Sequence, residues 1–109
     1  MKTTTTLIRA ALAATLMLTL ASLARAADAA DNWKAKCAAC HAADGSGNTT
    51  MGKKLKLMDY TSADAQAKFT DEEAIKTITD GKKPMPAYKD KLSADEIKAL
   101  AAYIRTLKK

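Results

Sequence analysis

The sequence predicts an all-α protein. Residues 70–81 and 93–109 carry apolar side chains at helical spacing behind helix-capping motifs. Residues 27–40 repeat apolar positions every fourth residue. The chain contains no alternating run of apolar and polar residues of the kind that forms a strand. We therefore expect three to five helices joined by long loops.

The first predicted helix spans residues 27–40. It places Ala29, Trp33 and Cys37 on one face, and Asp28 or Asp31 is expected to cap its start. The stretch HAADGSGNTT that follows is rich in Gly, Ser and Asn and is predicted to be a loop.

The second half of the chain has clearer helix boundaries. Residues 51–69 are ambiguous apart from a short helix predicted from Ser62. Thr70 and Glu73 form a capping box, and Gly81 is expected to end that helix. Ser93 begins a second capping box with Glu96, and the helix behind it carries an apolar stripe of Ile97, Leu100, Ala101, Ile104 and Leu107.

The first 26 residues have the pattern of a secretory signal peptide. Lys2 and Arg9 precede an apolar block over residues 10–24, and Ala24-Arg25-Ala26 fits a signal peptidase site. The block is shorter than the ~20 residues that cross a bilayer, so we expect cleavage before Ala27 and export to the periplasm. A retained membrane anchor is the alternative. Residues 27–109 then form the single domain.

The predicted mature chain is small and poor in aromatic residues. It keeps one Trp, one Phe and three Tyr. A domain of this size is only marginally stable unless disulfides, a metal or a bound cofactor support its core. Loss of Lys2, Arg9 and Arg25 reduces 18 basic residues to 15 against 12 acidic ones, so the formal charge falls from +6 to +3. This mild basicity argues against nucleic-acid binding.

The pentapeptide Cys37-Ala38-Ala39-Cys40-His41 holds every Cys and His of the chain. A zinc site usually takes four Cys or His ligands, and this chain has only three such residues. A thioredoxin-type motif normally follows a strand, and the chain shows no strand pattern. A disulfide over so short a loop constrains little and leaves His41 without a role. Covalent haem attachment gives each residue a role, because thiols three residues apart project from one side of a helix toward two vinyl groups and the next residue is a haem-iron ligand. Zinc or a disulfide is the alternative.

A second axial ligand is sought among Met51, Met58 and Met85, because no second His is present. Pro84 and Pro86 exclude a helix and fix the backbone on both sides of Met85, so that this methionine loses little entropy when it binds. We therefore predict Met85 as the ligand. Met51 and Met58 are expected to be packing or loop residues.

Around these motifs the chain resembles the class I c-type cytochromes, specifically the small soluble bacterial ones. The resemblance covers nearly all of residues 27–109 and depends on NWKAKCAACHAADG, on DGKKPMPAYKDKLSADEIKALAAYIRTL and on their order. It implies a small cytochrome c fold around one covalent haem c. It also implies that Cys37 and Cys40 form the thioethers and that His41 and Met85 bind the iron.

The resemblance further implies that the first and last helices cross, with Trp33 and Tyr103 at the contact and Leu100 beside them. The sequence departs from the family pattern in two places. Ala29 stands where the crossing often has Gly, which is expected to widen the crossing slightly. No Pro follows the haem motif to accept the ring N–H of His41, so another carbonyl within residues 48–57 is expected to orient this ring.

A haem with His and Met in both axial positions has no open coordination site, so we expect an electron carrier and not an enzyme. The haem wall is expected to come from Leu55, Leu57, Ile75, Ile78 and Leu92. If the bond from Met85 is labile, a small-ligand sensor or a weak peroxidase is the alternative, and a periplasmic zinc or redox protein without haem is the third hypothesis.

Two groups of lysines are expected to steer the carrier toward acidic surfaces of redox partners such as an oxidase, a quinol-oxidising complex or a peroxidase. They are Lys82, Lys83, Lys89 and Lys91, and Lys53, Lys54 and Lys56. We expect a monomer with no nucleic-acid partner and no stable membrane insertion after cleavage.

Overall fold

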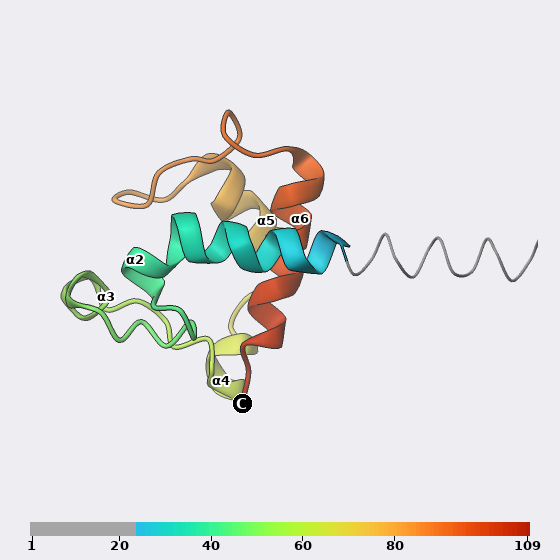
Figure 1. Cartoon of the computed structure of the whole chain (residues 1–109). Coiled ribbons are helices and arrows are strands. Elements are labelled where there is room, and N and C mark those ends of the chain that lie inside the picture. The colour runs from blue at the N-terminus through green and yellow to red at the C-terminus, as the bar shows by residue number, and fades with distance from the viewer. Residues whose placement is uncertain (1–23) are drawn as a thin grey trace, which may run out of the picture.

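The computed structural model describes residues 24–109, and these begin with a continuous helix over residues 24–41 (Figure 1). Residues 24–32 are α-helical, η1 (Trp33–Cys37) is a π-helical turn, and α2 (Ala38–His41) ends the helix. We call residues 24–41 the N-terminal helix. The predicted cleavage point before Ala27 lies inside it, whereas residues 1–23 of the predicted signal peptide lie outside the described residues.

The prediction that Asp28 or Asp31 caps the first helix is wrong, because both lie within the helix. The chain is already helical at Ala24, and alanine is the best helix former. No helix within residues 24–109 combines the length and apolarity required to cross a membrane.

Two short helices lie in the ambiguous middle segment. The predicted helix from Ser62 is confirmed as α4 (Ala63–Gln66), where the Ser62 side chain accepts the N–H of Ala65. The other, α3 (Thr50–Leu55), was not predicted. Its N-cap, Thr49, accepts the N–H of Gly52.

Both predicted capping boxes are present, and they set the starts of α5 (Asp71–Asp80) and α6 (Ala94–Thr106). Thr70 N–H donates to the Glu73 carboxylate at 2.9 Å, and Glu73 N–H donates back to the Thr70 hydroxyl at 3.1 Å. Gly81 ends α5 with φ 75°, as expected of a residue without Cβ.

Residues 82–92, which we call the Met85 loop, connect α5 to α6 without a helix, as the two prolines predict. Lys82 N–H donates to the Met85 carbonyl at 3.1 Å, and Met85 N–H donates to the Lys82 carbonyl at 2.8 Å, which closes a tight turn. Tyr88 N–H then donates to the Ile78 carbonyl at 3.0 Å. The loop is therefore closed on itself and fastened to the end of α5.

The predicted helix crossing is confirmed, because the N-terminal helix passes across α6 (Figure 1). Ala29 is 2% exposed, so the methyl group that replaces the hydrogen of a glycine is fully packed there. Trp33 and Tyr103 lie with ring centroids 5.8 Å apart. Asn32 Nδ2 also donates to Glu96 Oε2 at 3.2 Å, which joins the two helices.

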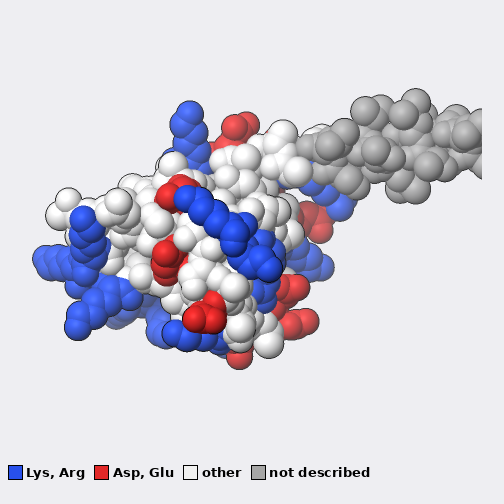
Figure 2. All heavy atoms as spheres, turned by 90° about the horizontal axis from the view of Figure 1, so that it is seen from below, with Lys and Arg blue, Asp and Glu red and all other residues white. Residues whose placement is uncertain are grey.

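Basic and acidic side chains are partly segregated on the surface. On the face seen in Figure 2, lysine and arginine side chains gather at the end of the molecule where Figure 1 places α3. The acidic side chains of this face lie toward its middle and its other end. The lysines of α3 and its C-cap, Lys53, Lys54 and Lys56, are exposed, and so are the loop lysines Lys82, Lys83, Lys89 and Lys91.

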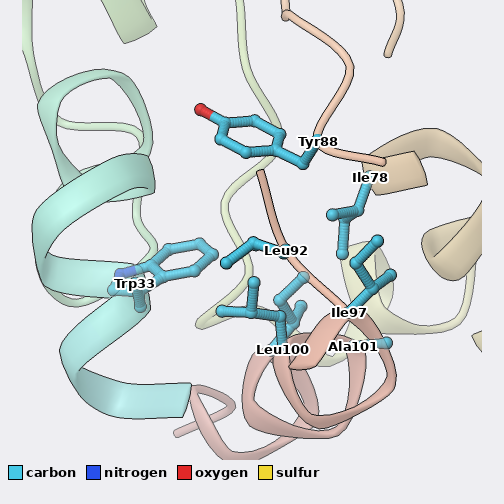
Figure 3. Close-up of a cluster of buried hydrophobic side chains, with 8 residues drawn as sticks. Trp33, Ile78, Tyr88, Leu92, Ile97, Leu100 and Ala101 are labelled. Atoms are coloured by element: carbon cyan, nitrogen blue, oxygen red, sulfur yellow. The ribbon is translucent and has the colours of Figure 1, made fainter. Parts of the chain in front are cut away.

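One hydrophobic cluster joins the N-terminal helix, α5, the Met85 loop and α6 (Figure 3). It consists of Trp33, Ile78, Tyr88, Leu92, Ile97, Leu100, Ala101 and Ile104. The predicted apolar stripe of the last helix supplies four of these residues. The described fold has no strand beyond an isolated bridge between Lys82 and Met85, so the all-α prediction is confirmed.

Candidate haem site

Cys37 and Cys40 lie one helical turn apart at the end of the N-terminal helix. Both side chains are half-buried free thiols, and residues three apart on a helix project from the same side. Burial raises the pKa of the Cys37 thiol to about 11, against a smaller lowering by the ammonium of Lys36. At neutral pH Cys37 is therefore a protonated thiol.

His41 is the last residue of α2, and two aromatic rings hold its imidazole. The ring stacks on Tyr60 with centroids 5.6 Å apart at 26°, and it lies 5.6 Å from the Trp33 ring at 41°. Burial lowers the pKa of His41, which favours the neutral imidazole that binds metals. Its Nδ1 is buried and has no hydrogen-bond partner. Buried polar atoms without a partner are uncommon in folded proteins.

The expectation that a carbonyl within residues 48–57 orients the His41 ring is wrong for this structure, because Nδ1 finds no acceptor. The helix α3 explains this, because it engages backbone carbonyls of that segment. The Thr49 carbonyl accepts the N–H of Lys53, and the Gly52 carbonyl accepts the N–H groups of Lys56 and Leu57. Both carbonyls are therefore engaged by the helix and its C-terminal turn.

The Cys40 carbonyl, inside the pentapeptide, is held by the side chain of Thr49 and closely approached by Gly52, two residues that the sequence did not reveal as site residues. Thr49 Oγ1 donates to the Cys40 carbonyl at 2.6 Å and accepts the N–H of Gly52 at 2.8 Å. Gly52 permits this approach, because a Cβ there would lie 2.7 Å from the Cys40 carbonyl oxygen. The spacing of Thr49 and Gly52, an N-cap and the residue three positions later, is the only sequence feature that hints at this contact.

Trp33 fixes the other side of the same turn. Its Nε1 donates to the carbonyls of Ala42 and Ala43 at 3.1 Å and 3.2 Å. The family resemblance implies that Trp33 lies at the helix crossing, and the structure adds this second role. The segment that carries both cysteines and His41 is therefore held by Trp33 at one side and Thr49 at the other.

Met85 is half-buried and packs against the hydrophobic cluster, as Cys37 does. Met51 and Met58 are 44% and 41% exposed, so neither is an interior packing residue. Of the five predicted wall residues, Ile78 and Leu92 are buried in the cluster, whereas Leu55, Leu57 and Ile75 are half-buried. The last three keep apolar surface that a haem would cover.

These residues fit a c-type haem. Two thiols face one side of a helix, the imidazole that follows them is held by two aromatic rings, and the Met85 thioether packs on the same cluster as Cys37. Within residues 24–109, His, Cys, Asp and Glu side chains form no group of three or more that would hold a metal ion.

Comparison with known proteins identifies the family. The family model described as cytochrome C oxidase, cbb3-type, subunit III, matches residues 24–104. The cytochrome c6 of Leptolyngbya boryana is 43% identical over 81 residues, which are 72% of this chain and 91% of that protein. The cbb3-type cytochrome c oxidase subunit FixP of Azorhizobium caulinodans is 39% identical over 79 residues, 72% of this chain but only 26% of that protein.

A solved structure agrees. The KustC0563 c-type cytochrome superposes with a TM-score of 0.68 at 34% identity, over 73% of this chain and 96% of that one. The chain therefore belongs to the cytochrome c family, as a small class I c-type cytochrome with one covalent haem c.

Proposed function

We propose that this protein is a periplasmic carrier that passes single electrons between redox proteins through a haem ligated by His41 and Met85. Family membership supports the cofactor, and several relatives are cytochromes c6. The observation that carries the ligand assignment is the imidazole of His41, which directly follows the two thiols and is held by the rings of Trp33 and Tyr60.

Cys37 and Cys40 would hold the haem by adding their S–H groups across its two vinyl groups, which gives two thioethers. His41 would bind the iron from the side of the N-terminal helix, where Trp33 and Tyr60 already fix its ring. The haem supplies the redox chemistry, because its iron accepts and releases one electron.

Met85 would occupy the remaining axial position and so exclude substrate. A thioether ligand favours the ferrous form and raises the potential. The turn between Lys82 and Met85 and the two flanking prolines hold the backbone of Met85 before it binds. A ligand held in this way allows the oxidation state to change with little movement, which suits a carrier and not an enzyme.

Exposed lysines of the Met85 loop would guide docking to acidic surfaces of an oxidase, a quinol-oxidising complex or a peroxidase. Lys82, Lys83, Lys89 and Lys91 are all exposed there. Charges of this kind accelerate encounter with a partner of opposite charge and lose their effect in high salt. We further propose that the carrier acts as a monomer.

The alternative of a peroxidase or a ligand sensor requires a free distal group. The guanidinium of Arg105 is engaged, since it donates to the Asp71 carboxylate at 2.9 Å and to the Phe69 carbonyl at 2.8 Å. No contact in the described chain favours this alternative over electron transfer.

Periplasmic location depends on cleavage of the predicted signal peptide. Expression with an export and haem-attachment system, followed by mass measurement of the intact periplasmic protein, is expected to show residues 27–109 plus one haem. A mass that includes residues 1–26 would support the membrane-anchor alternative.

Two measurements on that protein test the function. A haem that stays bound on a denaturing gel, with one thioether lost in each of Cys37→Ala and Cys40→Ala, supports the attachment sites. A reversible one-electron titration without slow phases supports the carrier. A colourless protein, or one that turns over peroxide as rapidly as a peroxidase, would refute the proposal.

A further inference from the structure

The Met85 loop makes one hydrogen bond to the helix that carries Cys37, Cys40 and His41. Tyr88 Oη donates to the Lys36 carbonyl at 3.1 Å, across 52 positions of sequence. The other hydrogen bonds of residues 82–92 within the described chain stay inside the loop or run to α5. Tyr88 is therefore the direct polar link between the two halves of the proposed ligand set.

Both ends of this link are firmly held. The Tyr88 side chain belongs to the hydrophobic cluster and is 9% exposed, and its N–H donates to the Ile78 carbonyl. Figure 3 shows the ring lying over the cluster with its hydroxyl directed toward the helix that carries Trp33. The acceptor, Lys36, lies in the π-helical turn η1, one residue before Cys37.

The link is short along the chain at both ends. Met85 precedes Tyr88 by three residues, and Cys37 follows Lys36 directly. A displacement of Met85 away from the N-terminal helix moves the backbone of the loop, and the Tyr88 hydroxyl resists that movement as long as it keeps its acceptor. We propose that Tyr88 is a positioning residue that holds the Met85 loop closed over the haem and so keeps external ligands away from the iron. This inference rests on the proposed ligation by Met85.

The experiment uses the ferric holoprotein and imidazole as the external ligand. Imidazole has to displace Met85, so its apparent affinity includes the free energy of opening the loop. Tyr88→Phe keeps the ring in the cluster and removes only the hydroxyl. If opening breaks the hydrogen bond, the variant binds imidazole about 2- to 10-fold more tightly than wild type, as expected for the loss of one net hydrogen bond.

Tyr103→Phe is the matched control. It removes a phenolic hydroxyl from a half-buried ring on α6, where that hydroxyl makes no hydrogen bond within the described chain. Its imidazole affinity is expected to equal that of wild type. Chemical unfolding of both variants distinguishes loop opening from general destabilisation of the fold. General destabilisation lowers the unfolding midpoint but leaves the imidazole affinity unchanged. Equal imidazole affinity of Tyr88→Phe and wild type would overturn the inference.

The wild-type holoprotein gives an independent test that needs no variant. The Tyr88 hydroxyl proton is expected to exchange slowly with water in the ferric protein and rapidly at saturating imidazole. Slow exchange in both states would overturn the inference. Failure of the underlying ligation looks different, since the wild type would then lack the far-red charge-transfer band of a bond between methionine sulfur and ferric iron.

Discussion

Trp33 in the N-terminal helix and Tyr103 in α6 lie with their ring centroids 5.8 Å apart, inclined at 49°. The same indole is 3% exposed, lies 5.6 Å from the His41 ring and donates to the carbonyls of Ala42 and Ala43. One side chain therefore joins the helix crossing to the haem-binding turn. Stability of the fold and order of the site are coupled through it.

Replacement of Trp33 by Ala is expected to destabilise the holoprotein by about 3–5 kcal/mol, because it removes a fully buried aromatic ring and its two hydrogen bonds. Trp33→Phe keeps an aromatic ring and is expected to cost less. Chemical denaturation followed by circular dichroism measures both. Lys34→Ala, at the exposed neighbouring position, is expected to lie within about 0.5 kcal/mol of wild type. Equal effects at positions 33 and 34 would contradict this account of the crossing.

Arg105 fastens α6 to the end of α4 and to the segment before α5. It donates to the Gln66 carbonyl at 2.5 Å, the Gln66 side-chain oxygen at 2.9 Å and the Phe69 carbonyl at 2.8 Å, and it lies over the Phe69 ring. Lysine lacks this fork of donors, so Arg105→Lys is expected to destabilise by about 1.5–3 kcal/mol. The measurement is the free energy of unfolding.

The exposed pair of Lys76 and Asp80 provides the comparison for Arg105. Its atoms are 3.1 Å apart, but the lysine side chain is 80% exposed. Lys76→Ala is therefore expected to change stability by less than about 0.5 kcal/mol. A loss at position 76 as large as that at position 105 would contradict the small contribution expected of an exposed ion pair.

Glu96 makes part of the stability dependent on pH. Hydrogen bonds from the Ser93 backbone and from Asn32 lower the pKa of this carboxyl below its ordinary value of 4.5. A lowered pKa in the fold means that the ionised form is stabilising, and this contribution is complete above the unfolded value and disappears as the pH falls through the folded value. In melting experiments between about pH 6 and pH 3, wild type is expected to lose stability more steeply than Glu96→Gln. Parallel pH profiles would contradict the assigned role.

The lysines of the Met85 loop predict opposite salt effects with oxidants of opposite charge. Ferricyanide, an anion, is expected to oxidise the reduced protein more slowly as salt rises, and a cationic cobalt(III) phenanthroline complex more rapidly. Lys82→Glu with Lys83→Glu is expected to slow the ferricyanide reaction roughly 3- to 10-fold at low ionic strength.

The matched control for those lysines is Lys68→Glu with Lys109→Glu, which changes the net charge equally at two other exposed lysines. Lys109 lies at the C-terminus near α4, away from the Met85 loop (Figure 1). This control double variant is expected to slow the ferricyanide reaction less than Lys82→Glu with Lys83→Glu does. Equal slowing by the two double variants would show that net charge, not the loop, governs the encounter.

The sequence predicted those elements whose cause is local. The side chains of Thr70 and Ser93 determine helix starts within three residues, and the apolar stripe of α6 faces the core that its period predicts. Helix α3 escaped prediction because it is six residues long and its cap, Thr49, also serves the Cys40 carbonyl. The start of the first helix was mispredicted for another reason, because the chain is already helical before Asp28.

The residues of the candidate site likewise fall into those that a local pattern indicates and those that depend on contacts distant in sequence. The positions of Cys37, Cys40 and His41 follow from a motif of five consecutive residues, and the flanking prolines singled out Met85. The contacts of Thr49 and Tyr88 join segments distant in sequence, and nothing in the local pattern of either residue names its partner. The carbonyl acceptor expected for the His41 ring was mispredicted for a related reason, because the helix over residues 50–55 was not predicted.

Ligation of the haem iron by Met85 is tested by the optical spectrum of the ferric holoprotein and of its Met85→Ala variant. We expect sharp c-type bands on reduction and, in the ferric wild type, a weak far-red band from sulfur bound to iron that is absent from Met85→Ala. Met51→Ala and Met58→Ala, at the two exposed methionines, are expected to keep that band. A wild-type protein without the band, or a Met85→Ala variant that keeps it, would contradict electron transfer through a haem ligated by His41 and Met85.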